Sequence, residues 1–304
     1  MKKVVYHGIK DVRIKETEEP TPGPGEIKVK VKYCGICGSD KHEYIHGPFP
    51  ITCFGHEVCG TVTDVGKNVI GFKKNDRVLA VSIGGFAEYM TAPQERAMKL
   101  PDELSWEKAA VLEPFAGAAY AVKMGNVSSD DTVLITGAGA VGLMLLLAVK
   151  SLGVQTVYMT DVSLQKQKIA KKLGALDALN PLDIKIPKKI KEYTNNKGVD
   201  VAIEAVGIQS SLKDCLASTR YQGTVIVQGI FTERVPVHML GFVTNEMRMI
   251  GANNIDTSQA LEWMMTKDIK PESIITSIIP LDEIIHAGFE VKNPDSQIKI
   301  LVAP

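Results

Sequence analysis

The sequence has no excess charge of either sign, no long apolar segment and few cysteines. Its 35 basic and 35 acidic residues balance, so we expect no basic surface that would bind nucleic acid or an anionic membrane. The N-terminus has no apolar core of signal-peptide length, and the longest apolar run, residues 141–149, is too short to span a bilayer. These absences predict a cytoplasmic protein and are compatible with a small neutral substrate.

The cysteine count and the chain length indicate the kind of protein and the number of its domains. Five cysteines, an odd number placed mainly beside histidine and glutamate, suit metal chemistry in a reducing compartment better than a disulfide scaffold. A chain of 304 residues favours two domains, because single hydrophobic cores stop growing at about 250–300 residues. The sequence contains no internal repeat and no low-complexity segment.

The chemically informative stretch is C-G-I-C-G-S-D-K-H at residues 34–42, followed by G-H-E at residues 55–57. Thiolate, imidazole and carboxylate are all accepted by zinc. Catalytic zinc sites use three protein ligands and leave one position for water or substrate. Cys37, His56 and Glu57 match that pattern.

Two other interpretations of the cysteines remain open. Cys34 and Cys37 form a C-x-x-C that could be a redox pair, and with Cys53 and Cys59 they could form a structural zinc site. A redox C-x-x-C usually opens a helix, whereas residues 26–33 alternate like a half-buried strand and the neighbouring glycines do not favour a helix afterwards. A zinc ribbon needs a second close pair, but Cys53 and Cys59 are six residues apart.

The secondary-structure pattern changes once along the chain. The first part predicts short β-strands broken by glycine, proline and Asn-Asp turns, with a hairpin in residues 1–15 and strands at 26–33, 58–65, 77–81 and 85–92. Residues 100–122 have a helical pattern. Strands at 131–136, 156–161, 199–205, 223–229 and 247–252 then alternate with helices, which predicts an α/β, doubly wound, mostly parallel sheet. Residues 260–267 and 281–291 are expected to be helical, and residues 297–302 a closing strand.

A glycine-rich G-x-G-x-x-G segment follows the strand at 131–136 and opens a helix. Gly137 permits the tight turn, Gly139 lets the backbone approach a pyrophosphate, and Gly142 allows close packing of helix and strand. Ala140 and Val141 complete the segment at the start of the helix, whose N-terminus favours negative charge. This context predicts a dinucleotide-binding site.

Asp161 ends the next strand, and it is the residue expected to select the nicotinamide cofactor. Its carboxylate can accept hydrogen bonds from the ribose hydroxyls and would repel a 2′-phosphate, which predicts NAD over NADP. Asp161 could instead only cap a helix that starts near Ser163. Lys166 and Lys168 leave NADP open as an alternative cofactor, because their side chains could reach its 2′-phosphate.

In combination, C-G-S-D-x-H at 37–42, G-H-E at 55–57 and Glu113-Pro114 resemble the zinc-dependent medium-chain alcohol dehydrogenases, in the branch of sorbitol, 2,3-butanediol and threonine dehydrogenases. The resemblance runs nearly end to end. It implies a mainly antiparallel β GroES-like catalytic domain and a Rossmann domain that binds NAD. The expected boundaries are 1–115 with 253–304 for the catalytic domain and 116–252 for the NAD-binding domain. A homodimer or homotetramer is also implied.

The resemblance also implies roles for individual residues. Cys37 and His56 are expected to bind one catalytic zinc ion, with Glu57 and Glu113 binding together or in alternation. Ser39 matches the hydroxyl that hydrogen-bonds the substrate oxygen. His42 matches the end of a proton relay through the cofactor ribose, although it could equally be a solvated loop residue.

The remaining polar and sulfur-bearing residues near this stretch have simpler expected roles. Asp40 is expected to fix the loop or to orient a metal ligand. The other four cysteines are expected to fill the core; they are Cys34, Cys53, Cys59 and Cys215.

One departure from the family stands out. Many members carry a lobe with four closely spaced cysteines that hold a structural zinc. Here the Asp-Arg-Val strand and the Gly-Phe-Ala-Glu strand are separated only by residues 79–84, which contain no cysteine. The chain is therefore expected to lack that lobe and to bind one zinc ion.

The predicted activity is oxidation of a secondary alcohol, polyol or vicinal diol to a ketone. Removing the hydroxyl proton is the difficult step, and zinc makes that proton easier to remove. Two alternatives remain, a threonine-type amino-alcohol dehydrogenase and a catalytically silent NAD-binding sensor.

Overall fold

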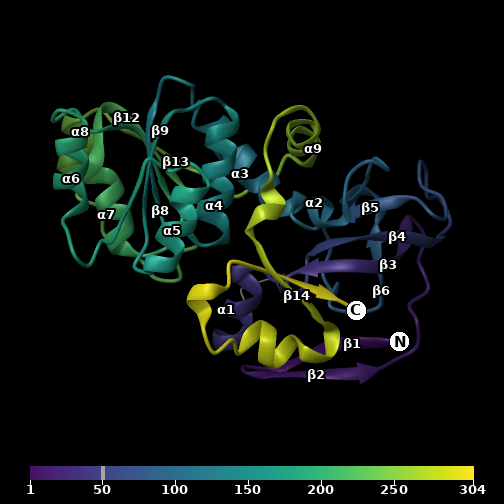
Figure 1. Cartoon of the computed structure of the whole chain (residues 1–304). Coiled ribbons are helices and arrows are strands. Elements are labelled where there is room, and N and C mark those ends of the chain that lie inside the picture. Colours follow the sequence, from purple (N-terminus) through teal and green to yellow (C-terminus); the bar gives the residue numbers. More distant parts are fainter. Residues whose placement is uncertain (49–51) are drawn as a thin grey trace. The chain divides into compact units, whose positions relative to one another are not determined.

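A computed structural model describes residues 1–48 and 52–304, and the chain in it divides into two units (Figure 1). Unit 1 consists of Met1–Glu113 and Pro271–Pro304, and unit 2 consists of Pro114–Lys270. The sequence placed residues 253–270 with the catalytic domain, whereas here they belong to unit 2. Helix α9 (Thr257–Thr266) buries Trp263, whose ring lies 6.5 Å from that of Phe115 in the same unit.

Unit 1 contains a mainly antiparallel sheet and a separate hairpin, which confirms the predicted β architecture. The sheet has seven strands in the order β14-β15-β3-β4-β5-β7, with β6 pairing with β3. Only the pairing of β14 with β15 is parallel among those described. The strands are β3 (Glu26–Gly35), β4 (Glu57–Val65), β5 (Arg77–Ala80), β6 (Tyr89–Pro93), β7 (Ala97–Lys99), β14 (Ile275–Pro280) and β15 (Lys299–Ala303), and the hairpin joins β1 (Lys2–Gly8) to β2 (Asp11–Glu16).

The alternating sequence of β3 explains its place in the middle of this sheet. Ile27, Val29 and Val31 are buried, while the lysines between them are more exposed. This two-residue period is the one that a strand with one face on the core requires. Strand β3 is therefore fixed in register, and the residues that follow it are carried to a defined position.

The helices of unit 1 correct one prediction. The prediction that the neighbouring glycines disfavour a helix after Cys37 is wrong, because α1 (Gly38–His46) begins immediately after it. Asp40 in the first turn accepts the backbone N–H of Cys37 at 2.7 Å, which satisfies a donor at the helix start. The predicted helical segment at 100–122 is present as α2 (Trp106–Ala110) and α3 (Leu112–Met124).

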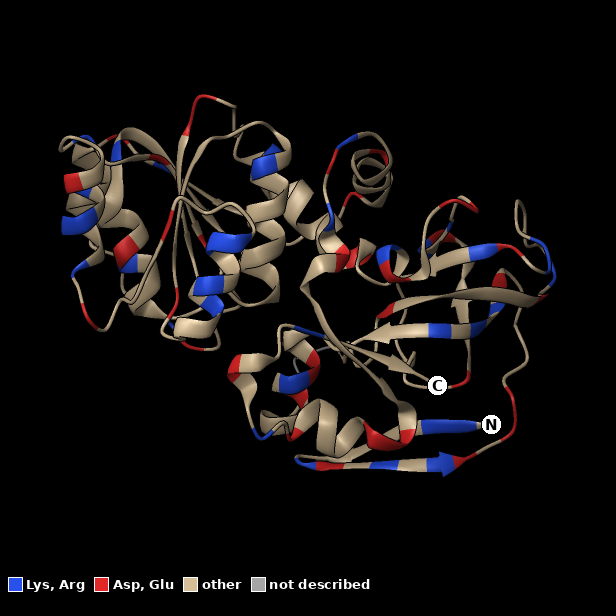
Figure 2. Cartoon of the chain, in the orientation of Figure 1, with Lys and Arg blue, Asp and Glu red and all other residues tan. Residues whose placement is uncertain are grey.

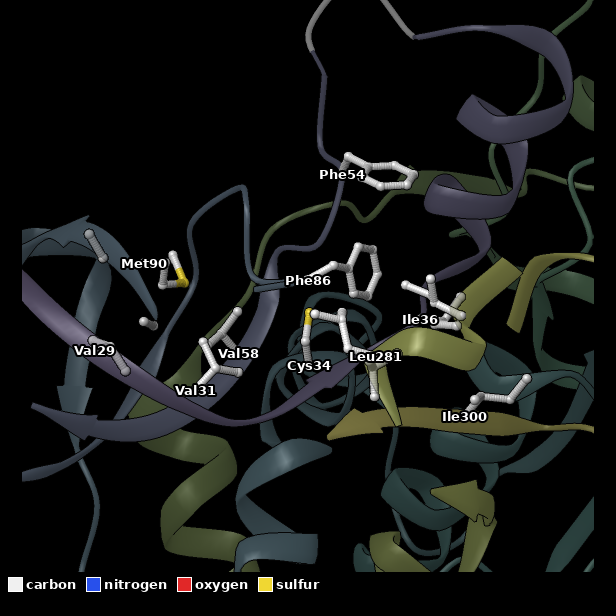
Figure 3. Packing of buried hydrophobic residues seen from close by; sticks show 14 of the residues in the cluster. Val29, Val31, Cys34, Ile36, Phe54, Val58, Phe86, Met90, Leu281 and Ile300 are labelled. Carbon is white, nitrogen blue, oxygen red and sulfur yellow. The ribbon is translucent and has the colours of Figure 1, made fainter. Parts of the chain in front are cut away.

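The core of unit 1 lies directly beneath the cysteine-rich stretch. Figure 3 shows the Cys34 sulfur among Val58, Phe86 and Leu281. The ring of Phe54 lies 5.1 Å from Phe86 in an edge-on contact, which adds to the burial of both rings. This packing anchors β3 and the segment before β4, the two segments that lead into the candidate site.

Unit 2 confirms the predicted doubly wound parallel sheet. Its six strands follow the order β10-β9-β8-β11-β12-β13 and all pair in parallel. Helices α4 and α5 lie on one side of the sheet and α6 and α7 on the other (Figure 1). The strands are β8 (Thr132–Thr136), β9 (Thr156–Thr160), β10 (Asp177–Leu179), β11 (Val199–Glu204), β12 (Thr219–Val227) and β13 (Arg248–Gly251), and the helices are α4 (Ala140–Ser151), α5 (Leu164–Lys172), α6 (Ile186–Tyr193), α7 (Gln209–Ser218) and α8 (Met239–Thr244).

The strand order of unit 2 also indicates where a ligand binds. The order reverses between β8 and β11, and in sheets of this kind ligands bind in the crevice outside the carboxyl ends of the strands at such a switch point. The glycine-rich segment follows β8 at that end of the sheet.

Residues of both charge signs occur in each unit. Figure 2 shows lysine and arginine segments interspersed with aspartate and glutamate segments on the helices and strands of each unit. Within residues 1–48 and 52–304, no helix combines the length and apolarity needed to cross a bilayer.

Candidate metal centre and dinucleotide-binding loop

Three potential metal ligands of different chemistry come together in unit 1. One ligand atom from each of Cys37, His56 and Glu57 lies within 4.8 Å of the other two. Cys37 precedes helix α1, and Glu57 opens strand β4 directly after His56. The antiparallel pairing of β3 with β4 places Gly35 opposite Glu57, so the sheet itself brings the two segments side by side.

Asp40 fixes the two ligand-bearing segments to each other, as predicted. Its Oδ2 accepts the N–H of Cys37 at 2.7 Å and its Oδ1 accepts the N–H of Gly55 at 2.8 Å. It is fully buried, and burial raises the pKa of the Asp40 carboxyl to about 6, although the nearby His56 works in the opposite direction. Asp40 therefore acts on the site through the backbone and is not in the group of potential metal ligands.

The hydrogen bonding of His56 leaves one ring nitrogen for a metal. Nδ1 lies 2.5 Å from the carbonyl oxygen of Cys53, which can only accept, so Nδ1 carries the proton. Nε2 is then the nitrogen that can bind a metal, an arrangement common for metal-ligating histidines. Burial alone would lower the pKa of His56, but hydrogen bonds to Cys37 and Cys53 raise it overall.

Glu57 is paired with a residue that motif analysis missed. The Nζ of Lys299 forms an ion pair with Glu57 Oε2, and each side chain is only 1% exposed. Lys299 opens β15 near the C-terminus, far from the other site residues in sequence. A single lysine inside the apolar run I-K-I-L-V was the one signal that could have drawn attention to it.

Glu113 lies in the first turn of α3 and shares the electrostatic environment of the other site residues. Burial, with the negative charge of Glu57 as a second cause, raises the pKa of the Glu113 carboxyl to about 7, whereas the nearby His56 works in the opposite direction. Among the described residues, Glu113 is not part of the group formed by Cys37, His56 and Glu57. A metal ion bound nearby would favour its ionised form.

Ser39 and His42 lie on helix α1, which begins directly after Cys37. The Ser39 hydroxyl is buried and has no hydrogen-bond partner in the part of the chain that the structure describes. A buried hydroxyl without a partner is costly, and a substrate oxygen would satisfy it. His42 follows three residues later on the same helix, where its ring lies 4.9 Å from that of His46.

The other cysteines take no part in the centre. Cys34, Cys59 and Cys215 are buried, as predicted for core-filling residues, whereas Cys53 is half-buried and serves the site through its backbone carbonyl. Burial raises the pKa of Cys34 well above its usual value and that of Cys59 to about 12. None of these thiols is in the described group of potential metal ligands, so neither the redox pair nor the four-cysteine site is supported.

The glycine-rich segment in unit 2 has the space that a phosphate needs. Gly137 adopts a φ of +85°, and a Cβ at Gly142 would overlap the carbonyl oxygen of Gly137, so both positions require glycine. Gly139 has nothing within 4 Å of its missing side chain and precedes α4, whose first residues are Ala140 and Val141. The open side of Gly139 and the helix N-terminus together suit a pyrophosphate.

Asp161 is held in place beside this segment. Its Oδ2 accepts the N–H of Ala138 at 2.8 Å and its Oδ1 accepts the N–H of Ser163 at 2.8 Å. The cap of α5 is Ser163, whose side chain accepts the N–H of Lys166. Asp161 thus links the glycine-rich segment to the end of β9, and each carboxylate oxygen retains acceptor capacity for a ribose hydroxyl.

The donor set in unit 1 fits zinc. Sulfur, imidazole nitrogen and carboxylate oxygen are its three protein donor types, and three protein ligands are the number found in catalytic zinc sites. The unpartnered Ser39 hydroxyl is a further polar group available to a bound molecule at this site.

Comparisons with known proteins show the family to which the chain is similar. Residues 23–102 match the model of the alcohol dehydrogenase GroES-like domain, and residues 140–267 match that of the zinc-binding dehydrogenase. The (R,R)-butanediol dehydrogenase of Bacillus subtilis (strain 168) is 34% identical over 348 aligned residues, which cover 100% of both chains. The sorbitol dehydrogenase of the same organism is 28% identical, over 100% of this chain and 97% of the relative.

A solved structure has the same fold over its whole length. The crystal structure of 2R,3R-butanediol dehydrogenase from Bacillus subtilis matches with a TM-score of 0.92 and 32% identity, covering 100% of this chain and 99% of that one. The sequence alignment spans 348 residues, whereas this chain has 304, so part of the relative has no counterpart here. The short connection at residues 79–84 is compatible with that difference.

Proposed function

The chain belongs to the zinc-dependent medium-chain alcohol and polyol dehydrogenases, and on that premise we propose that it transfers hydride between NAD and a secondary hydroxyl of a vicinal diol or polyol. The observation that carries the proposal is the grouping of Cys37, His56 and Glu57 within 4.8 Å. The complete glycine-rich segment with Asp161 in unit 2 supports the cofactor assignment.

The proposal gives each residue of the centre a chemical role. Cys37 and His56 hold zinc, with Glu57, Glu113 or both completing the protein ligands. When bound, zinc supplies a Lewis acid that makes a hydroxyl proton easier to remove. Ser39 hydrogen-bonds the substrate oxygen and takes part in moving its proton, and His42 is the proposed end of that relay towards solvent.

The substrate class follows from the named relatives together with the site. The relatives reported above are named for butanediol and sorbitol, which carry neighbouring hydroxyl groups. Vicinal diols and polyols are therefore the first class to test, and a threonine-type amino alcohol is the second. A silent NAD-binding sensor is disfavoured, because Cys37, Ser39 and His56 are all retained.

A panel of alcohols separates these possibilities. Purified protein with zinc and NAD should produce NADH absorbance with a vicinal diol or a polyol, at a higher kcat/KM than with threonine or a simple secondary alcohol. A higher kcat/KM with threonine would favour the amino-alcohol alternative. NAD binding without NADH formation from any alcohol of the panel would contradict the proposed activity.

Asp161→Gly should shift the cofactor preference. The change removes an acceptor for the ribose hydroxyls and the repulsion of a 2′-phosphate, so the ratio of kcat/KM for NADP to that for NAD should rise about tenfold or more, which corresponds to about 1.4 kcal/mol. The ratio is the appropriate measurement, because loss of the bond to Ala138 would weaken both cofactors together. An unchanged ratio would show that Asp161 does not select the cofactor and has only a structural role.

The proposal also includes location and assembly. Five cysteines present as free thiols suit a reducing compartment, and we propose the cytoplasm. A homodimer or homotetramer is the assembly proposed from the family, and sedimentation analysis of the zinc-loaded protein would measure it.

A further inference from the structure

The ion pair between Lys299 and Glu57 is the most deeply buried pair of opposite charges at the site. Both side chains are 1% exposed, and the Lys299 ammonium also donates to the carbonyl oxygen of Ile36 at 3.1 Å. A buried charge without a partner is strongly destabilising, so each member of such a pair constrains the other. Glu57 is at the same time one of the three grouped metal ligands.

The surrounding backbone makes room for this pair. Gly35 lies opposite Glu57 in the pairing of β3 with β4 and opposite Leu301 in the pairing of β15 with β3. A Cβ at Gly35 would overlap Glu57 Oε2 and would lie 3.0 Å from the Cε of Lys299. Glycine at this position therefore leaves the space in which the ammonium and the carboxylate meet.

Strand β15 also holds the backbone that leads to Cys37. The N–H of Ile36 donates to the carbonyl oxygen of Ile300 at 2.9 Å, and the carbonyl oxygen of Ile36 accepts from Lys299. Both polar backbone atoms of the residue before Cys37 are thus bound by two successive residues of β15. Strand β15 consequently contacts the candidate centre at two points, at Glu57 through the Lys299 ammonium and at Ile36, the residue before Cys37.

We propose that Lys299 is a positioning residue of the metal centre, which occupies one carboxylate oxygen of Glu57 so that Glu57 cannot turn both oxygens to the metal. One metal position then stays open for the substrate. The inference rests on the proposed zinc site and deepens it. Without the ammonium, the metal is the cation nearest to the buried Glu57 carboxylate, and both oxygens become available to it.

Lys299→Met tests this most directly, because methionine replaces the long apolar stem without the charge. We expect zinc to bind about tenfold or more tightly in competition with a chelator, because the centre gains negative charge and a free carboxylate oxygen. In the cobalt-substituted protein the visible absorption should lose intensity as the coordination number rises, and kcat should fall. This combination of tighter metal binding and slower turnover is not produced by a loss of structural support.

Three matched variants complete the design. Lys299→Arg keeps the charge and should retain the parent cobalt spectrum. The double variant Glu57→Gln with Lys299→Met removes both charges, and it should not show the tighter zinc binding of Lys299→Met, because position 57 then has no carboxylate to offer a second oxygen. Gly35→Ala separates the pair while leaving both charges in place, so it should reproduce the change seen in Lys299→Met, and it supplies the test if that variant is too unstable to purify.

Two outcomes would overturn the inference. One is a parent-like cobalt spectrum in both Lys299→Met and Gly35→Ala. The other is weaker zinc binding in Lys299→Met than in the parent protein. A parent protein that oxidises diols but shows either outcome would retain the proposed function and lose only this inference. A protein that shows the expected spectral changes but oxidises no alcohol would lose the proposed function and keep the inference.

Discussion

Replacing Cys37 by serine should abolish alcohol turnover and leave NAD binding close to that of the parent protein. Cys37 belongs to the metal group in unit 1, whereas the glycine-rich segment that would bind NAD lies in unit 2. Loss of a thiolate ligand removes zinc, which contributes several kcal/mol to charge stabilisation; we expect a loss of about 10³-fold or more in kcat. His56→Ala should have the same effect, since it removes a second ligand.

The measurements are NADH formation, metal content and NAD titration on the same preparations. Cys53→Ser is the matched control, because Cys53 lies in the same unit and contributes its backbone carbonyl, not its sulfur, to the site. It should retain zinc and most of the activity. Full turnover by metal-free Cys37→Ser protein would show that the reaction does not need this centre.

Chelation should remove activity without unfolding the protein. The core of unit 1 is built from side chains such as Phe54, Phe86 and Phe289, and unit 2 has its own core. Small zinc domains unfold without metal because the metal replaces a core, and that condition does not hold here. We expect the circular dichroism and the cooperative unfolding transition to persist largely unchanged in stripped protein.

Elemental analysis before chelation should give one zinc ion per chain. Residues 79–84 contain no cysteine, and the described residues form a single group of potential metal ligands. Its three protein ligands should leave the ion open to exchange. Two tightly held zinc ions per chain, or collapse of the fold on chelation, would contradict this account of the cysteines.

Much of the fold could be predicted because it depends on local periodicity. The alternation in residues 26–33 predicted β3, and the apolar strand, glycine-rich segment and apolar helix predicted β8 and α4. Elements with weak local signals were missed. Strand β10 has three residues, and α6 is a short lysine-rich helix with a proline in its first turn.

Helix α1 shows why local propensity was misleading. Gly38 alone argues against a helix, but Asp40 satisfies the N–H of Cys37 and is itself buried by contact with the His56 segment. These tertiary contacts thus stabilise a helix start that the low helix propensity of glycine would not favour. Cys37 therefore stands at a helix start, as a redox cysteine would. It has no redox partner in Cys34, however, because Cys34 is buried in the hydrophobic core.

The candidate site divides in a similar way. Cys37, His56 and Glu57 were predicted from short motifs, and the structure brings them together. Lys299 could not be predicted, because nothing in the residues around it carries a metal-binding pattern. Its role depends on the pairing of β15 with β3, which joins residues more than 260 positions apart, as in the bond from Lys299 to Ile36.

The most direct test of the central claim is zinc restoration of diol oxidation. Protein stripped of metal, supplied with NAD and a vicinal diol, should form no NADH. Addition of one equivalent of zinc per chain should restore turnover, and Cys37→Ser protein treated in the same way should stay inactive. Equal turnover before and after zinc addition, or no turnover of any vicinal diol or polyol by the zinc-loaded protein, would contradict the account.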